Sequence, residues 1–153
     1  MKISELLNPQ AIIAKLEATE KGAVLAELTD RLVSLESDLD RDAVLAVLHE
    51  REKLGSTGIG DGVAIPHGKI SGLPELRLVF ARSRKGVDFE SMDGQLARLF
   101  FLLIAPEGSV GVHLKTLARI SKLLKDATVR KKLLNAADDQ DIYRIIVENE
   151  GSS

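Results

Sequence analysis

The chain has 153 residues, of which 44% are hydrophobic and 29% charged, so it can bury one substantial core but is too short for two ordinary domains. A formal net charge of -2, a sequence pI of about 5.9 and an aromatic content of 3% argue against nucleic-acid binding, which uses a basic face and stacking aromatic side chains. The absence of cysteine excludes disulfides, thiolate catalysis and cysteine-metal sites.

Segments that would direct the protein into a membrane are not visible in the sequence. The N-terminal stretch MKISELLNPQ is neither a charged leader nor a long apolar run, and the longest apolar segment, Leu99 to Ala105, is far too short to span a bilayer. We therefore expect a cytoplasmic protein without membrane insertion.

The first third of the chain carries mostly helical signals. Ile3 to Leu7 favours a short helical turn, and Ala11 to Leu16 favours a first strand that stops near Lys21-Gly22. Helical spacing then predicts a helix on the apolar residues Val24, Leu25, Leu28, Leu32 and Leu35. Asp40 is expected to cap a second helix, whose inner stripe is formed by Val44, Val47 and Leu48.

The most informative segment follows, GSTGIGDGVAIPHGK from Gly55 to Lys69, in which five glycines and one proline surround His67. Glycine permits backbone angles closed to other residues, and Pro66 fixes one dihedral and keeps the preceding residue extended. This composition predicts a loop that presents His67. Imidazole can be a nucleophile, a proton carrier or a metal ligand near neutral pH, so the role of His67 decides the function.

Strand-like patterns come after this segment. Leu76 to Arg82 and Leu99 to Ala105 are both predicted strands, and the second is apolar at every position, as in a central strand covered on both faces. Between them, Val87 and Phe89 alternate with polar neighbours, and Asp93-Gly94 favours a turn.

Helices are predicted again at the C-terminal end. One starts at His113 and carries the apolar positions Leu114, Leu117, Ile120, Leu123 and Leu124. Shorter helices are expected near Val129 to Leu134 and Asp138 to Val147, and Gly151 to Ser153 is a frayed end or a remnant of cloning. The order of elements predicts a single layered α/β domain over residues 1–150, with a sheet sandwiched between helices.

A run of basic residues marks this C-terminal part. It consists of Lys115, Arg119, Lys122, Lys125, Arg130, Lys131 and Lys132, interrupted only by Asp126. The run is either a solvated helical face or a docking surface for an acidic or phosphorylated protein.

Known nucleotide-binding loops do not match the glycine segment. A P-loop has four residues between its glycines followed by Lys-Ser or Lys-Thr, whereas Gly62 to Gly68 encloses five and Lys69 is followed by isoleucine. Gly58, Gly60 and Gly62 lack the spacing of the third glycine in the dinucleotide fingerprint. The sequence therefore does not predict a nucleotide site here.

A zinc site is also not predicted. The three histidines, His49, His67 and His113, have no local ligand spacing such as H-x-x-x-H. His49 lies mid-helix beside Glu50 and is interpreted as a solvated residue.

Two residues could assist His67. Arg51 continues the inward stripe of the second helix, where it either complements the helix dipole or holds a phosphoryl group beside the loop. His113 lies at a predicted helix start, where a neutral imidazole could hydrogen-bond a phosphate, although a backbone-satisfied histidine is the structural alternative.

The segment REKLGSTGIGDGVAIPHGK, Arg51 to Lys69, resembles the signature of the IIA components of the bacterial phosphoenolpyruvate-dependent phosphotransferase system, fructose/mannitol type (type 2). The resemblance covers essentially the whole chain and implies a mixed β-sheet between helices. It identifies His67 with the phosphorylated histidine, Arg51 with the active-site arginine, and His113, in VHLKTLARISKLL, with the second histidine of the site. The GSTGIG lead-in and the length are most similar to the nitrogen-regulatory subclass.

This resemblance implies a phosphocarrier that accepts a phosphoryl group on Nε2 of His67 from a phosphorylated HPr-like carrier. Arg51 would neutralise charge on the transferring group, and His113 would supply hydrogen bonds together with Ser56, Thr57 and Gly68. No cofactor, nucleotide or metal is needed, because the phosphoryl group arrives already activated on another histidine. A protein that forms such a phosphohistidine intermediate belongs to the phosphotransferase class if it is counted as an enzyme.

The resemblance also implies regulatory partners, such as potassium-transport or sensor-kinase proteins, that respond to the phosphorylation state. Two alternatives stay open. The protein could be a IIA donor to the IIB component of a fructose/mannitol-type sugar permease, or an interaction module whose His67 does not turn over.

Overall fold

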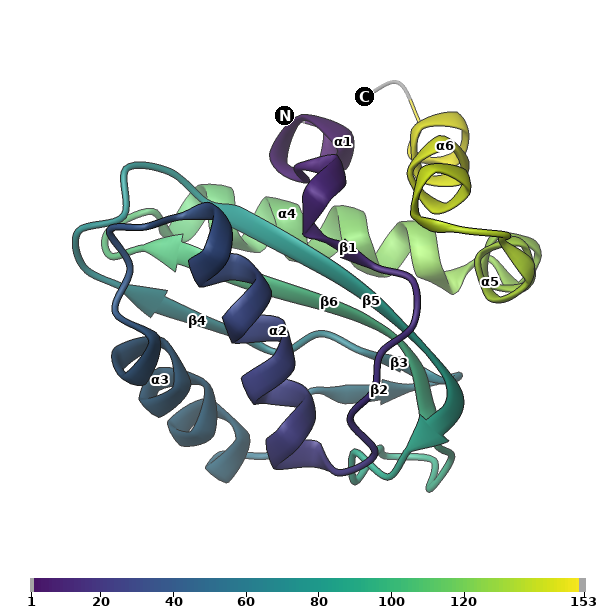
Figure 1. Ribbon diagram of the computed structural model, residues 1–153, viewed down its shortest axis with the longest axis horizontal. Helices are drawn as coiled ribbons and strands as arrows, with labels where there is room; N and C mark the ends of the chain where they lie inside the picture. The colour runs from purple at the N-terminus through teal and green to yellow at the C-terminus, as the bar shows by residue number, and fades with distance from the viewer. Residues whose placement is uncertain (1, 152–153) are drawn as a thin grey trace.

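A mixed sheet forms the middle layer of the fold in the computed structural model, which describes residues 2–151 (Figure 1). Its strands are β1 (Ile12–Ile13), β2 (Gly58–Gly60), β3 (Val63–Ala64), β4 (His67–Ile70), β5 (Arg77–Val87) and β6 (Ala97–Pro106). The helices are α1 (Ile3–Leu6), α2 (Lys21–Leu35), α3 (Arg41–Lys53), α4 (Val110–Lys125), α5 (Ala127–Asn135) and α6 (Asp139–Asn149), with a 3-10 turn η1 at Pro9–Ala11.

The helices cover the two faces of the sheet in separate groups. Helices α2 and α3 pack together on one face, and α4 crosses behind the sheet and leads into α5 and α6 (Figure 1). The predicted α/β sandwich is therefore confirmed. Of the described residues, none lies in a helix that is both long and apolar enough to cross a membrane.

Strand β6 organises the sheet, whose order is β1-β5-β6-β3-β2. It pairs antiparallel with β5 on one side and parallel with both β3 and β4 on the other. The predicted central strand is confirmed, because every side chain from Leu99 to Ala105 is at most 1% exposed. Since Val63 pairs with Leu99 and His67 with Leu103, the glycine segment runs along the edge of β6.

Two predicted strands have different bounds in the structure. The first strand was expected over Ala11 to Leu16, but only Ile12–Ile13 is strand, because Pro9 begins a 3-10 turn that the Asn8 side chain caps. The strand predicted to end at Arg82 continues to Val87, where it still pairs with β6. The turn at Asp93-Gly94 is present.

The helix predicted to start at His113 begins three residues earlier, at Val110, so His113 lies in its first turn and donates its backbone N–H to Ser109. Leu114 was expected on the inner stripe, but it is 60% exposed. The buried face of α4 instead begins with His113 and Thr116. Because successive helical positions differ by about 100°, moving the face by one residue turns Leu114 outward. The Asp40 cap of α3 is confirmed, with the carboxylate accepting from Asp42 N.

The predicted helices near the C-terminus are confirmed as α5 and α6. Asp126 and Asp138 cap them by accepting backbone N–H groups, which explains the acidic residue that interrupts the basic run. Of the predicted frayed end, Ser152 and Ser153 lie outside the described residues.

Candidate functional site

The glycine segment was expected to be a loop throughout, but the structure divides it into β2, β3 and β4. Left-handed backbone angles at Gly60 and Gly62, with φ values of 98° and 79°, turn the chain between β2 and β3. His67 is the first residue of β4 and pairs with Leu103 on the central strand. The histidine is therefore presented from a strand end, which fixes its backbone more firmly than a free loop.

Two hydrogen bonds define the protonation of His67. Its Nδ1–H donates to the Ile65 carbonyl at 2.7 Å, and the Arg51 Nε–H donates to its Nε2 at 3.3 Å. A ring nitrogen that accepts a hydrogen bond carries a lone pair, so the contacts assign the neutral tautomer protonated on Nδ1. This tautomer leaves Nε2 as the nucleophilic nitrogen.

The surroundings keep His67 neutral. Burial lowers the pKa of His67 from its usual value, and the charge of Arg51 lowers it further, while the Ile65 carbonyl and Glu52 oppose the shift. The pKa of His113 is also lowered, first by burial and then by His67 and Lys69. Both imidazoles therefore remain unprotonated at neutral pH.

His113 meets His67 edge to face, with ring centroids 5.5 Å apart and an interplanar angle of 85°. Only 6% of His113 is exposed, and its Nδ1 has no hydrogen-bond partner among the described residues. A buried polar atom of this kind costs about 1–3 kcal/mol when unpaired. The backbone-satisfied alternative is therefore absent at Nδ1, which is a buried atom without a hydrogen bond among the described residues.

A cavity of about 570 Å³ opens over these side chains, between α3, β4 and the first turns of α4. Arg51, His67 and His113 all line it. Its apolar lining includes two strongly exposed leucines, Leu54 at 84% and Leu114 at 60%. Exposed leucines beside polar catalytic-type groups are typical of a surface that another protein covers.

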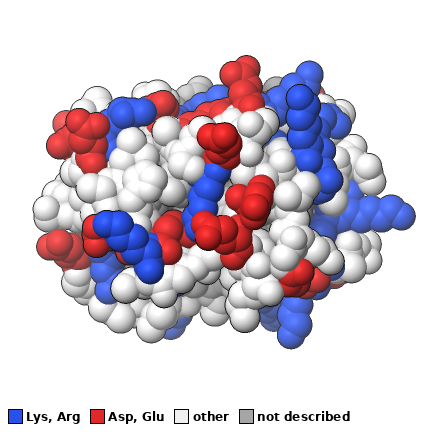
Figure 2. Space-filling view, turned by 90° about the horizontal axis from the view of Figure 1, so that it is seen from below, with Lys and Arg blue, Asp and Glu red and all other residues white. Residues whose placement is uncertain are grey.

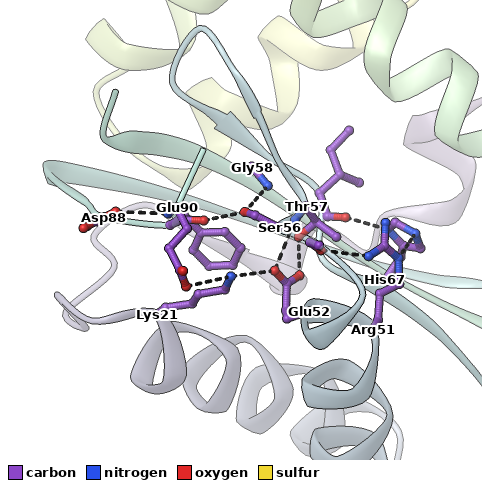
Figure 3. Close-up of polar contacts among 12 residues, drawn as sticks. Lys21, Arg51, Glu52, Ser56, Thr57, Gly58, His67, Asp88 and Glu90 are labelled. Carbon is purple, nitrogen blue, oxygen red and sulfur yellow. Dashed lines mark hydrogen bonds and ion pairs between the residues drawn. The ribbon is translucent and has the colours of Figure 1, made fainter. Parts of the chain in front are cut away.

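A network around Glu52 holds the beginning of the segment against α3 (Figure 3). The Glu52 carboxylate accepts from both the backbone N–H and the hydroxyl of Thr57 and pairs with Lys21 at 2.9 Å. Lys21 Nζ also lies 4.8 Å from the centre of the Phe89 ring. Arg51 also contacts this segment, because its Nη1–H donates to the Gly55 carbonyl at 2.9 Å. The Glu52 network therefore fixes the part of the chain to which Arg51 is bonded.

The remaining candidate residues have intramolecular roles in the structure. The Ser56 hydroxyl donates to the Phe89 carbonyl, and the Thr57 hydroxyl donates to Glu52, so both hydroxyl hydrogens are used within the chain. His49 is exposed on α3, as expected. Within residues 2–151, His, Cys, Asp and Glu side chains nowhere gather in a group of three that could hold a metal ion.

Glu52 was missing from the predicted site, although the sequence held a signal for it. A carboxylate in the last turn of a helix faces the negative end of the helix dipole, so Glu52 at the C-terminal end of α3 needs a specific partner. Its partners are Thr57, five residues ahead, and Lys21, which is distant in sequence. Only the contact with Thr57 could have been predicted from residues that are close together in the sequence.

Gly68 sets the distance between β4 and α3. A Cβ added at Gly68 would overlap Val47 Cγ1, while Val47 Cβ would be 3.6 Å away. A valine in a helix strongly prefers one χ1 rotamer, so it cannot easily turn aside. The missing side chain at Gly68 therefore lets α3 approach closely enough for Arg51 to contact His67.

The Gly68→Ala variant is expected to lose about 1–3 kcal/mol of unfolding free energy through overpacking against Val47. Adding Val47→Ala should restore most of this loss, because it removes Cγ1 and leaves an ordinary contact with Cβ. Urea denaturation of the two single variants and the double variant measures the coupling between the residues. Additive effects would show that the two side chains do not compete for the same space.

Protein stability should depend on pH through the two histidines. Because the pKa values of His67 and His113 are lowered in the folded state, the unfolded chain binds more protons below about pH 6.5. The unfolding free energy should therefore fall as pH falls from 6.5 toward the folded-state pKa values, and it should be insensitive to these groups above that range. Urea denaturation between pH 5.5 and 8 should show a smaller slope in a His67→Gln/His113→Gln variant, and an equal slope would contradict the assignment.

The chain as a whole is similar to known proteins in both sequence and fold. The family model described as "Phosphoenolpyruvate-dependent sugar phosphotransferase system, EIIA 2" matches residues 5–149. A "Nitrogen regulatory protein" of Bradyrhizobium diazoefficiens is 47% identical over 146 residues, which is 95% of each chain. The "PTS system fructose-specific EIIABC component" of Bacillus subtilis is 41% identical over 98% of this chain, which spans only 24% of that larger protein. The crystal structure of "Nitrogen Regulatory Protein IIA-Ntr" from Neisseria meningitidis superposes with a TM-score of 0.88, at 33% identity, over 94% of this chain and 98% of that one.

Proposed function

Because the chain belongs to the EIIA type 2 family of the phosphoenolpyruvate-dependent sugar phosphotransferase system, we propose that it is a phosphocarrier of the nitrogen-regulatory branch. The observation that carries this proposal is the neutral His67, whose Nε2 lone pair contacts Arg51 within an open cavity. Full-length similarity to proteins named nitrogen regulatory protein favours this branch.

The proposed reaction transfers a phosphoryl group between two histidines. The Nε2 lone pair of His67 forms a bond to phosphorus while the phosphorus–nitrogen bond to a histidine of an HPr-like carrier breaks, and the leaving nitrogen keeps the electron pair. The His67 Nδ1 proton stays on its hydrogen bond to the Ile65 carbonyl throughout. No net proton transfer is required, which agrees with a nucleophile that is already neutral.

The neighbouring groups stabilise the transferring phosphoryl group in this proposal. Arg51 is already within 3.3 Å of Nε2, so its guanidinium lies where negative charge develops on the equatorial oxygens. The His113 ring lies beside the same position, with its centroid 5.5 Å from that of His67. Ser56 and Thr57 act by holding the segment in place, and Gly68 acts by admitting α3.

The apolar rim of the cavity, formed by Leu54, Val110 and Leu114, serves as the docking surface for the carrier in this proposal. With its Nδ1 proton kept, a phosphorylated His67 adds about one net negative charge and three phosphoryl oxygens at the centre of this rim. Such a change alters which proteins bind there, so we propose that regulatory partners such as potassium-transport or sensor-kinase proteins read the phosphorylation state in the cytoplasm.

A second candidate, supply of phosphate to a sugar-permease IIB component, is favoured by the 41% identity to the fructose-specific EIIABC component. An interaction module without turnover at His67 is the remaining alternative. The three functions differ in whether phosphate reaches His67 and where it goes next.

One assay separates them. The protein is incubated with labelled phosphoenolpyruvate, the first enzyme of the system and either HPr or its nitrogen-branch counterpart, and acid-labile phosphate on the protein is measured. Faster labelling by the nitrogen-branch carrier supports the proposed function, and onward transfer to a IIB cysteine supports the sugar branch. A protein that stays unlabelled with both carriers would overturn the phosphocarrier proposal.

A further inference from the structure

A second cluster of basic side chains surrounds a buried arginine on β5. Arg82 is 1% exposed, and its guanidinium donates from Nε to the Ala14 carbonyl at 3.1 Å and from Nη1 to the carbonyls of Leu133 and Ala136 at 2.9 and 2.6 Å. All three acceptors are neutral. Its Nη2 has no hydrogen-bond partner among the described residues.

This buried cation is stabilised by carbonyl dipoles, two of them at the C-terminal end of α5, but no carboxylate is hydrogen-bonded to it among the described residues. A buried guanidinium is normally paired with a carboxylate, because an unpaired buried charge costs several kcal/mol. Asp141 is close enough to act on Arg82 through its charge, but it accepts from Ala137 N and forms an ion pair with Arg144. The pKa of Arg82 is lowered, first by burial and then by the neighbouring Arg84. The site therefore favours an additional anion.

Arg82 lines a cavity of about 250 Å³, together with Ser83, Arg84, Arg98 and Leu134. Three of these five residues carry a guanidinium and none carries a carboxylate. The Arg98 side chain is held in place by donating from Nη1 to the Arg84 carbonyl across the β5–β6 pair. The cavity lining therefore combines three guanidinium groups, of which those of Arg82 and Arg98 are held by hydrogen bonds. A guanidinium group suits a phosphate better than a flexible lysine does.

An adjoining cavity of about 300 Å³ shares Ser83 and Arg84 and adds Lys15 and Lys85, with Glu17 as its acidic residue. Figure 2 shows basic side chains projecting on the right-hand side of the molecule, the side on which β5 ends and β6 begins in Figure 1. The surrounding field therefore attracts anions to the same end of the sheet.

We propose that the Arg82, Arg84 and Arg98 cavity, which we call the arginine cavity, binds the phosphate group of a small ligand, either free phosphate or a phosphate monoester. It is separate from the site of His67. Arg82 pairs with Leu99 of β6, whereas His67 pairs with Leu103 on the other edge of that strand, about 13 Å further along it. A ligand here contacts the arginine side chains of β5 and β6, and it does not contact the phosphoryl-transfer residues.

The size of the arginine cavity limits the ligand. Sites for drug-sized molecules span about 300–1,000 Å³, so a cavity of 250 Å³ suits phosphate or a short ester rather than a nucleotide. An ester has room to extend over the shared Arg84 toward Lys15 and Lys85.

The test follows backbone amide signals by NMR during titration with inorganic phosphate or glycerol 3-phosphate, at ionic strength held constant with chloride. A His67→Gln protein is titrated in parallel, because phosphate bound near Arg51 would be weakened there. Saturable shifts of Ser83, Arg84, Arg98 and Leu134 in both proteins are expected. Tighter binding of glycerol 3-phosphate than of phosphate would identify the ester as the ligand, and the reverse would identify free phosphate.

Arg98→Gln and Arg84→Gln should each weaken this binding at least tenfold, while the fold is kept because neither guanidinium is buried. Lys131→Gln, an exposed change of the same charge on α5, serves as the matched control and should leave affinity nearly unchanged. Shifts that do not saturate, or an equal loss in the Lys131→Gln protein, would overturn the proposal by showing general surface electrostatics. Because the readout does not involve phosphoryl transfer, it can fail while the proposed function stands.

Discussion

Replacing His67 by glutamine should abolish phosphorylation of the protein by its carrier, with labelling reduced to background. The proposed bond forms at Nε2, and the glutamine amide nitrogen has no lone pair of comparable nucleophilicity. Glutamine can still accept a hydrogen bond from Arg51, so the local packing should be kept. The measurement is acid-labile label on the protein after incubation with the phosphorylated carrier.

The other two histidines provide controls for this experiment. His49→Gln alters an exposed residue on the same helix as Arg51 and should be labelled at the wild-type rate. His113→Gln should still be labelled, but more slowly, because the acceptor is intact and only a supporting hydrogen bond is altered. Persistent label in the His67→Gln protein would remove His67 from the proposed role, and loss of label only in His113→Gln would exchange the two histidines.

Replacing Arg51 by alanine should slow phosphoryl transfer about 100- to 1,000-fold, the usual effect of removing one electrostatic contact to a transition state. The effect has two physical sources. The guanidinium no longer neutralises the transferring group, and the pKa of His67 should rise because the Arg51 charge contributes to lowering it. Single-turnover rates measured from pH 6 to 8 separate these sources, since only the second diminishes at high pH.

Lys53→Ala is the matched control for Arg51→Ala. Both residues are basic and lie in the last turn of α3, but Lys53 is exposed and pairs with Glu50 at 3.0 Å. If both variants slowed phosphoryl transfer equally, the rate would depend on the positive charge at the end of α3 and not on the contact between Arg51 and Nε2 of His67. Arg51→Lys tests geometry further, because lysine keeps the charge but loses the fixed guanidinium, and it should restore only part of the rate.

The fold was predictable where the sequence pattern was long and regular. The β6 strand is apolar at every position from Leu99 to Ala105, and the stripes of α2 and α3 follow helical spacing, so local periodicity was sufficient. The strands β2, β3 and β4 were missed because each has only two to four residues. Strands β3 and β4 gain their hydrogen bonds from a distant partner, β6, and β2 pairs in turn with β3. Long-range pairing of this kind leaves no local pattern.

Part of the candidate site could also be predicted from the spacing of residues in the sequence. Arg51 could be placed beside the segment because it continues the stripe of α3, and the structure brings it to His67. His113 was placed near a helix start, but the contact between the two imidazoles depends on α4 crossing the sheet, which sequence spacing does not encode. Lys21 belongs to the supporting network only through tertiary packing.

The close approach of Gly68 to Val47 also restricts how this protein can change over evolutionary time. A lineage that acquires alanine at position 68 first passes through a strained intermediate, unless position 47 has already become smaller. Substitution at position 47 opens the path, and substitution at position 68 before it is disfavoured. The two residues lie on a helix and a strand that come together only when the chain folds. A steric overlap between Val47 Cγ1 and a Cβ at position 68 therefore sets the order of the two mutations.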